Sequence, residues 1–387
     1  MDDYLLTSES VAEGHPDKIA DRIADAIVDA CLLQDPWASV SCECLVKTGA
    51  VILAGQLSSR ANIDIARVAR ATIAASGYNC STRGFDAATC AVINLLSREP
   101  VARIRKADAL VADAQCVVAG YACDETPQLM PAPLWYAHRL MERYAALRKT
   151  QRRLLPDGKC QLTLRYRDGE VTGVNALTIS VQHCCDLSLP ALREMLTDEL
   201  IGPVIPARWL TSATRLLINP AGPQLNGGPA VSCGATGRKT SVDTYGGAIC
   251  HGGGALCGKD PAQVGRAGAY AARYIAKNIV AAGLAKRCAV QLAWAGGLSH
   301  PLSLSINTFG TARLAPQRLT RLVTRHFDLS IYGIIGQLDL LAPRYRQTAC
   351  YGHFGREQFP WELTDKAARL RDDAACQSDA QFHARLN

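Results

Sequence analysis

The sequence is poor in aromatic side chains, and it contains no long apolar run. Aromatic residues make up 6% of the 387 residues and charged residues make up 20%. No segment approaches the roughly 20 apolar residues that a membrane-spanning helix needs. Basic residues are scattered apart from short groups at 103–106 and 148–153, so the sequence lacks the continuous basic surface, interleaved with aromatics, that nucleic-acid binding requires. We therefore expect neither a membrane nor a nucleic acid as partner, and the net charge of +7 fits a small anionic ligand.

The 16 cysteines form no recognisable metal-binding or disulfide pattern. No pair has the C-x-x-C spacing, Cys184 and Cys185 are adjacent, and no histidine stands at zinc-ligand spacing from a cysteine. The chain starts with Met1-Asp2-Asp3, and the apolar segment of a signal peptide does not follow. We therefore expect a cytoplasmic protein whose thiols are mostly small, buried apolar groups.

What the sequence does contain is a glycine-rich run at residues 251–260, which we call the phosphate loop. Glycines allow backbone N–H groups to approach an anion closely. The spacing from Gly253 to Lys259 imitates a Walker A motif, but Asp260 stands where that motif has a Ser or Thr for magnesium. Pro261 predicts the start of a helix, whose N-terminus would add partial positive charge. The expected ligand is the phosphate chain of a nucleotide. The glycines that we assign to its binding are Gly253, Gly254 and Gly258.

Helical and strand patterns alternate along the chain in three blocks, each with a sheet and helices, which predicts an α+β fold. We place the domains at 1–100, 110–227 and 228–387. Residues 97–116 have poor periodicity and many arginines, so we expect a loop there, and we expect a docked tail after about residue 361. The expected helices span 16–33, 63–75, 131–149, 189–200, 261–282 and 317–327. The expected strands span 40–45, 50–57, 160–166, 171–182, 289–295 and 302–309.

A second candidate site lies at the start of the first expected helix. A helix N-terminus favours anions, His15 can donate to a phosphate oxygen, and Asp17 can hold magnesium. The alternative is that Asp17 only caps the helix and that His15 is an exposed loop residue. Arg238 and Lys239 form a third group beside a glycine, where the alternative is a solvated basic turn. On these grounds alone, Lys159 looks like a surface lysine.

Nine short motifs stand in order along the chain. They are TSESV (7–11), GHPDK (14–18), VKTG (46–49), GFD (84–86), LTSAT (210–214), GRK (237–239), VDTYGG (242–247), HGGGALCGKD (251–260) and YGHFGR (351–356). Their sequences and their order resemble those of the S-adenosylmethionine synthetase (methionine adenosyltransferase) family. The resemblance runs from residue 4 to about residue 367.

This resemblance implies three similar α+β domains and a tight homodimer, often paired into a tetramer, with active sites between subunits. It implies that the methionine sulfur attacks C5′ of ATP, and that the triphosphate leaves and is then hydrolysed to phosphate and pyrophosphate. That reaction needs cations and magnesium because negative charge builds on the leaving group. The residues carried over by motif are His15, Lys159, Arg238, Lys239 and Lys259 for the triphosphate, Asp113 and Gln115 for the nucleotide, Asp17 for Mg²⁺ and Glu43 for K⁺.

The chain departs from the family pattern where methionine would bind. Gln56 and Ser232 stand where the family has a glutamate and an aspartate that receive the substrate ammonium. Charge-assisted contacts are each worth roughly 1.5–3 kcal/mol, so losing both would weaken methionine binding about a hundredfold or more. The other changed positions of this acceptor pocket are Glu99 for a glutamine, Gln224 for an aromatic residue and Gly296 for a bulky aliphatic residue.

The nucleotide side differs as well, because Gln263 replaces a lysine and Gly265 replaces an aspartate that would bind magnesium. Asp113 stands one position before the acid that the family places near the adenosine. Three hypotheses follow from these differences. The first, which we favour because the triphosphate cations persist, is an active adenosyltransferase with an acceptor other than methionine. The second is an ordinary methionine adenosyltransferase, and the third is a non-catalytic nucleotide-binding relative.

Overall fold

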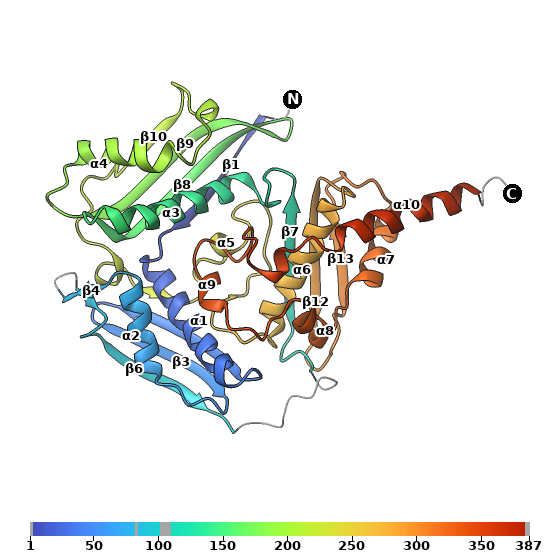
Figure 1. The fold of residues 1–387 in the computed structure, drawn as a ribbon, viewed down its shortest axis with the longest axis horizontal. Helices are drawn as coiled ribbons and strands as arrows, with labels where there is room; N and C mark the ends of the chain where they lie inside the picture. Colours follow the sequence, from blue (N-terminus) through green and yellow to red (C-terminus); the bar gives the residue numbers. More distant parts are fainter. Residues whose placement is uncertain (1–2, 82–83, 101–109, 384–387) are drawn as a thin grey trace.

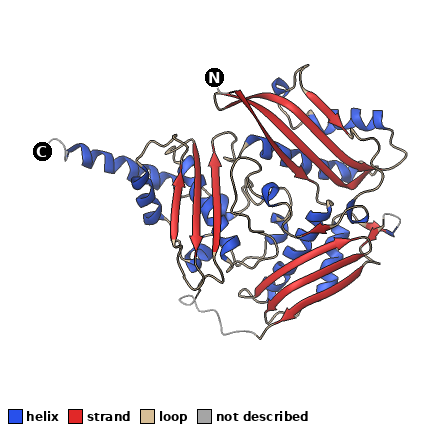
Figure 2. Cartoon of the chain, turned by 180° about the vertical axis from the view of Figure 1, so that it is seen from behind, coloured by secondary structure: helices blue, strands red, loops and turns tan. Residues whose placement is uncertain are grey.

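The computed structural model describes residues 3–81, 84–100 and 110–383, with side chains described up to residue 375. Three lobes surround a central region of loops, and each lobe is a sheet with helices on one face (Figure 1). Seen from behind, the strands of each sheet lie in front of the helices that pack on it (Figure 2). The expected α+β class is therefore confirmed. Among the described residues, no helix combines the length and the apolar composition that crossing a bilayer requires.

The first sheet contains the expected hairpin of β2 and β3, and α1 packs on β2. The imidazole of His15 caps α1 by accepting the Asp17 N–H (3.2 Å), and Pro16 occupies the first turn, where its missing N–H costs nothing. Ile19 and Ile23 are fully buried on the core side of α1. The strand order is β11-β2-β3-β6. The elements are α1 (Pro16–Gln34), β2 (Ser39–Lys47), β3 (Ala50–Ser58), α2 (Ile65–Ala75), β6 (Ala91–Arg98) and β11 (Gly234–Ala235), beside the small pair β4 (Asn79–Cys80) and β5 (Phe85–Asp86).

The second sheet has the order β1-β8-β9-β10, and α3 packs on β1 and β8. Its central hairpin turns at Asp168 and Gly169, which both have positive φ (52° and 86°), as a tight two-residue hairpin turn requires. The elements are β1 (Asp3–Val11), α3 (Ala132–Thr150), β8 (Leu154–Arg167), β9 (Glu170–His183), α4 (Leu189–Leu196) and β10 (Arg215–Ile218).

The third sheet has the order β13-β12-β7, and the buried helix α6 packs on β7 and β12. Gly120 of β7 permits this close approach, because a Cβ there would lie 2.0 Å from the backbone of Ala272. The elements are β7 (Cys116–Cys123), α6 (Val264–Ala281), β12 (Arg287–Trp294), β13 (Ser303–Asn307), α7 (Pro316–His326), α8 (Ile331–Gln337) and α10 (Ala367–His383), with the short helices α5 (Thr240–Asp243) and α9 (Tyr345–Thr348) in the central loops.

The three sheets are not built from three contiguous segments. The N-terminal strand β1 pairs with β8, β7 pairs with β12, and β11 pairs with β2. Each sheet therefore includes one strand from a distant part of the chain, and these strands connect the three lobes. The division at 1–100, 110–227 and 228–387 remains a prediction about sequence segments.

Most expected helices and strands are confirmed, two helices differ in their bounds, and the strands β1, β6, β7 and β10 are additional to those expected. The helix expected from Pro261 begins at Val264, because the Asp260 carboxylate accepts the Ala262 N–H (2.8 Å) and forms a turn first. The helix expected over 189–200 continues beyond α4 as a π-helix over Thr197–Ile201. The tail after residue 361 includes α10, which packs on α6 and α7. Residues 101–109 of the expected loop lie outside the described residues.

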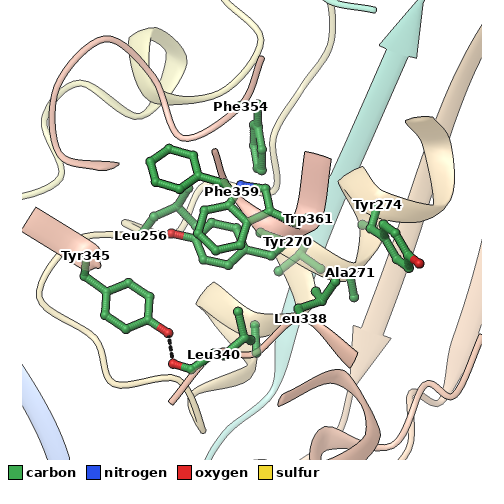
Figure 3. Packing of buried hydrophobic residues seen from close by; sticks show 14 of the residues in the cluster. Leu256, Tyr270, Ala271, Tyr274, Leu338, Leu340, Tyr345, Phe354, Phe359 and Trp361 are labelled. Atoms are coloured by element: carbon green, nitrogen blue, oxygen red, sulfur yellow. Dashed lines mark hydrogen bonds between the residues drawn. The ribbon is translucent and has the colours of Figure 1, made fainter. Parts of the chain in front are cut away.

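Aromatic side chains concentrate in the interior beside α6. The Tyr270 ring stacks on Trp361 with centroids 3.8 Å apart, and Trp361 stacks on Phe359 at 4.8 Å (Figure 3). Tyr345 lies nearby and donates its hydroxyl to the carbonyl of Leu340. These few large rings fix the segment after α9 against α6, next to the central loops.

Candidate active site

One group of predicted site residues lies at the N-terminal end of α1, and we call it the helix-end group. Its centre is the Asp17 carboxylate, which accepts from Lys239 Nζ (2.8 Å) and lies 3.6 Å from Arg238. Burial alone would raise the pKa of Asp17, but the hydrogen bonds from Lys239 and from the Ala235 N–H lower it overall. The members are His15, Asp17, Lys159, Arg238 and Lys239.

The cations of this group differ in exposure. The Lys239 side chain is 17% exposed, which contradicts the alternative of a wholly solvated basic turn, whereas Arg238 is 57% exposed. Lys159 pairs with Glu9 on the neighbouring strand at 2.6 Å, and its charge reaches His15. The group is therefore a buried carboxylate surrounded by cations, two of which face solvent.

His15 is a neutral hydrogen-bond donor at pH 7. Burial lowers its pKa to about 4, and nearby lysines lower it further, while Asp17 opposes the shift. Because Nδ1 accepts the Asp17 N–H, Nε2 carries the proton and can donate to a ligand oxygen. The alternative that Asp17 caps α1 and that His15 is an exposed loop residue is wrong, since His15 is the cap.

Four aspartates of α1, which we call the acidic row, recur at every fourth position and so lie on one helix face. Each carboxylate accepts backbone N–H groups from a segment distant in the sequence. From Asp17 to Asp25 the row extends about 12 Å along the helix, and it holds both the Arg238–Lys239 turn and the phosphate loop. The pairs are Asp17 with Ala235 (3.1 Å), Asp21 with Gly237 (2.9 Å), Asp25 with Gly258 (2.8 Å), and Asp29 with Tyr345 (2.8 Å) and Arg346 (2.9 Å).

The phosphate loop is anchored at its C-terminal end. Gly258 has a φ of 78°, and a Cβ there would lie 2.0 Å from the Cys42 carbonyl oxygen, so only glycine fits. Its carbonyl accepts from the Cys42 N–H (2.8 Å). Asp260 is fully buried, and its carboxylate accepts the Val40 N–H (2.9 Å). Asp260 therefore holds the backbone and does not replace the magnesium-binding hydroxyl of a Walker A motif.

A buried ion pair between α1 and α6 also holds the phosphate loop. Asp25 and Arg266 form two parallel hydrogen bonds (2.8 and 2.7 Å), and both side chains are 0% exposed. Arg266 also donates to the carbonyl of Lys259 (2.7 Å). In the exposed N-terminal part of the loop, Gly253 has a φ of 93°, and its N–H donates to the His251 imidazole (3.0 Å).

A second group of predicted residues lies on the outward face of the first sheet, and we call it the sheet-face group. Lys259 bridges to Ser41 of β2, and Ser41 is in register with Gln56 of β3. Because paired residues project on the same side of a sheet, Lys259 and Gln56 share a face. Glu43 is two residues after Ser41 and Glu99 follows β6, both on that same face. The members are Glu43, Gln56, Glu99 and Lys259.

The Lys259 ammonium lies beside the position where the family has an aspartate. A Cβ on Gly265 would lie 3.3 Å from Lys259 Nζ and 3.7 Å from Cys116 Sγ, and a Cβ on Gly254 would lie 3.8 Å from Nζ. Partial burial raises the pKa of Glu43, and Lys259 opposes this shift, so these two charges also interact. Gln263, in place of a lysine, donates to the Val40 carbonyl (2.7 Å) and packs inward.

The remaining predicted residues lie around these two groups. Gly296 packs against Asp113 and Ala114, so the structure brings one acceptor-pocket position beside the expected nucleotide segment, where Gln115 is exposed. Ser232 precedes Cys233, whose carbonyl accepts from Arg238 (3.0 Å), and so adjoins the helix-end group. Gln224 lies at the end of β9, where its carbonyl accepts the His183 N–H (3.0 Å). Within one chain, the structure therefore brings only Gln56 and Glu99 together among the five acceptor-pocket positions, and Ser232, Gln224 and Gly296 lie at three other places.

The residues present fit one Mg²⁺ better than two. Asp17 offers a carboxylate at the cationic cluster, and Mg²⁺ in nucleotide sites is usually held by one or two carboxylates together with substrate phosphates. Gly265 offers no ligand atom, and the neighbouring Lys259 ammonium disfavours a second cation there. Glu43 supplies one outward carboxylate, an oxygen ligand that suits K⁺.

The acidic row and Arg266, which position the predicted residues, are not recognisable as site residues from the sequence motifs. The signal was present as aspartates at 17, 21, 25 and 29 with four-residue spacing. Aspartates at this spacing are also typical of a solvent-exposed helix face. Only the hydrogen bonds that they accept from distant backbone N–H groups reveal that the acidic row positions the site.

A buried carboxylate ringed by cations, together with a glycine-rich loop carrying a lysine, is an arrangement typical of a protein that binds a phosphate chain. The S-adenosylmethionine synthetase N-terminal domain matches residues 3–101, its central domain matches residues 109–224, and its C-terminal domain matches residues 226–363. The chain therefore belongs to the S-adenosylmethionine synthetase family, whose members are ATP-binding transferases.

Proposed function

We propose that this protein is an ATP-dependent adenosyltransferase in which an acceptor other than methionine attacks C5′ of ATP. The triphosphate leaves and is then hydrolysed to phosphate and pyrophosphate. One observation carries the proposal: the cations of the helix-end group are held in place by the acidic row, whereas Gln56 and Ser232 lack the charges that a methionine ammonium needs.

The helix-end group would act on the leaving triphosphate. Lys239 and Arg238 supply positive charge where negative charge develops, and neutral His15 donates a hydrogen bond from Nε2. Lys159 would exchange its contact with Glu9 for a phosphate oxygen. Because the acidic row fixes the backbone at Ala235 and Gly237, these cations need little reorganisation during the reaction.

Mg²⁺ would bind at Asp17 together with phosphate oxygens, and it would neutralise charge on the triphosphate. K⁺ would bind at Glu43. Lys259, next to Gly265, would take over part of the charge that a second Mg²⁺ would otherwise balance. Gly253 and Gly254 would present backbone to the nucleotide beside Asp113 and Gln115. Gly258, predicted for the same role, instead anchors the loop, because its N–H and carbonyl are bonded to Asp25 and Cys42.

The acceptor would meet Glu99 and Gln56 on the sheet face. Glu99 is exposed and stands two residues after Ser97, which is in register with Gln56, so Glu99 and Gln56 would project from the same face of the sheet. This arrangement favours an acceptor whose positive charge or hydrogen-bond donors lie at a different position from the ammonium of methionine. Gly296 and Gln224 would make the pocket wider and more polar.

We further propose a homodimer, or a tetramer of two dimers, with active sites between subunits. Support comes from the separation of the two groups, one at the N-terminal end of α1 and the other on the outward face of the first sheet, and from the apolar residues around the sheet-face group. Leu45, Ile93 and Leu95 are 38%, 44% and 61% exposed on that face. A second copy placed there would cover these residues and bring its helix-end group toward Lys259.

The sequence segments 1–100, 110–227 and 228–387 are proposed as the three domains. A cytoplasmic location is also proposed, and the many buried, free cysteines suit a reducing compartment.

The test is to supply purified protein with ATP, Mg²⁺, K⁺ and methionine, and to measure S-adenosylmethionine, triphosphate, pyrophosphate and phosphate. We expect little S-adenosylmethionine. The double variant Gln56→Glu with Ser232→Asp should bind methionine at least about a hundredfold more tightly by calorimetry. Its matched control, Gln291→Glu with Ser303→Asp, adds the same charges to exposed positions of β12 and β13 and should not.

Rapid S-adenosylmethionine formation by the wild-type protein would identify an ordinary methionine adenosyltransferase and refute the changed acceptor. Failure to release triphosphate, pyrophosphate or phosphate from ATP with a panel of thiol, thioether and amine acceptors would favour the non-catalytic relative.

A further inference from the structure

Three ligand-type side chains converge beneath the phosphate loop. Asp243 of α5, Cys257 of the loop and His353 are each at most 2% exposed, and their ligand atoms all lie within 4.8 Å of one another. Cys257 Sγ and His353 Nε2 are 3.5 Å apart. Tetrahedral zinc with ordinary Zn–S and Zn–N bonds separates such atoms by about 3.6 Å, so the pair already has the required spacing.

The His353 ring is oriented as a metal ligand would be. Its Nδ1 is 2.8 Å from the Tyr270 hydroxyl, which in turn accepts from Arg266 Nε (3.1 Å). Zinc-bound histidines usually donate their second ring N–H to an oxygen in this way, which turns the other nitrogen toward the metal. Tyr270 itself is fixed by its stack on Trp361 (Figure 3), and the Trp361 Nε1–H donates to the His353 carbonyl (2.8 Å).

The charges around the cluster balance when a divalent cation is added. Lys18 of α1 donates to Asp21 (2.8 Å) and to one oxygen of Asp243, so one lysine faces two buried carboxylates. This leaves an excess of one negative charge among these groups. A divalent cation with the Cys257 thiolate would make the sum zero. A carboxylate has two oxygens, so Asp243 can keep Lys18 on one of them and bind the metal with the other.

We propose that Asp243, Cys257 and His353 form a buried zinc site. A ligand set of cysteine, histidine and carboxylate binds Zn²⁺ in preference to Mg²⁺ or K⁺. Binding forms the Zn–S bond as the thiol proton of Cys257 is released to solvent. Cys257 stands two residues before Lys259, so the metal would fasten the phosphate loop to the 351–356 segment.

The first test is the metal content of protein purified under reducing conditions from zinc-supplemented cells, measured by mass spectrometry. We expect stoichiometric zinc in the wild type and at least a tenfold loss in Cys257→Ser. The matched control is Cys350→Ser, which alters another buried cysteine outside the cluster and should keep the metal. Protein produced with Co²⁺ should show a thiolate-to-cobalt charge-transfer band in the near ultraviolet, absent from Cys257→Ser.

The variant Tyr270→Phe keeps the ring stack and removes only the hydroxyl behind His353. It should weaken zinc retention about 10–100-fold in competition with a chelator, and it provides an answer even if Cys257→Ser fails to fold. Folded wild-type protein without stoichiometric zinc and without the cobalt band would overturn the proposal and leave Cys257 as a thiol hydrogen-bonded to His353. Equal zinc retention by wild type and Cys257→Ser would overturn it as well.

Discussion

The buried pair of Asp25 and Arg266 offers the sharpest test of how the phosphate loop is held. The change is Asp25→Asn, which keeps the size of the side chain but removes its charge. The amide oxygen can still accept from the Gly258 N–H and from Arg266 Nη1, which both donate to Asp25 Oδ1. The amide nitrogen would then face a donor of Arg266, which has lost its counter-charge at a site with 0% exposure.

The expected loss can be bounded from the contacts. Removing one partner of a buried ion pair costs about 3–5 kcal/mol, because the remaining charge stays uncompensated. The matched control is Asp29→Asn on the same helix face. Asp29 accepts two backbone N–H groups, from Tyr345 and Arg346, and the structure gives it no ion pair among its described contacts. Losing one such hydrogen bond costs about 1–3 kcal/mol, so the two variants should differ by about 2 kcal/mol.

The assay combines urea unfolding with hydrogen exchange of peptides covering residues 251–260. Asp25→Asn should lower the free energy of unfolding more than Asp29→Asn does, and it alone should speed exchange in the phosphate loop. ATP binding, measured by calorimetry where both variants are folded, should weaken only in Asp25→Asn, because Arg266, which also holds the Lys259 carbonyl, loses its counter-charge. Equal destabilisation by the two variants, or unchanged exchange at 251–260, would refute the proposed anchoring.

Three further predictions concern single positions. Burial lowers the pKa of His15 from 6.5 to about 4, so as the pH falls between these values the unfolded chain takes up the proton before the folded protein does. The wild type should therefore lose up to about 3 kcal/mol of its unfolding free energy over this range. The variant His15→Asn, whose amide still caps α1, should not lose it, and urea unfolding at both pH values would show the difference. Gly258→Ala forces a Cβ to within 2.0 Å of the Cys42 carbonyl oxygen; it should abolish ATP binding in calorimetry and lower the melting temperature, whereas Gly169→Ala, which meets no atom within 4 Å, isolates the cost of positive φ. Leu95→Arg places a charge on the outward sheet face, where the wild-type leucine is 61% exposed; light scattering should show a shift toward monomer, and an unchanged mass would exclude this face from the dimer interface.

Local patterns predict much of this fold because they depend on neighbours in the chain. The apolar spacing at Ile19, Ile23 and Ile27 specifies α1, and the turn at Asp168 and Gly169 specifies the long hairpin. The exchange of β1, β7 and β11 between sheets depends on contacts between distant segments, which no local pattern encodes.

The candidate site shows the same limit. Its motifs identify Asp17, Lys239 and Lys259 one by one, but not the helix that aligns them. Cys257 and His353 are 96 positions apart, so their approach to 3.5 Å cannot be read from cysteine spacing. Asp260 illustrates the opposite error, since its place in a Walker-like motif suggests a role at magnesium and its burial gives it a role in the backbone.

The intact fold carries no information about the acceptor. The phosphate cations are tied to the fold, because the backbone that bears them is hydrogen-bonded to buried carboxylates of α1. Gln56, Glu99 and Ser232 are exposed, and substitutions at exposed positions usually change stability by no more than about 0.5 kcal/mol. Positions 56 and 232 can therefore lose or regain their charges without altering the scaffold. It follows that Gln56→Glu with Ser232→Asp should leave the unfolding free energy within that range while changing methionine affinity, and a large stability change would mean that these residues support the fold and do not contact the acceptor.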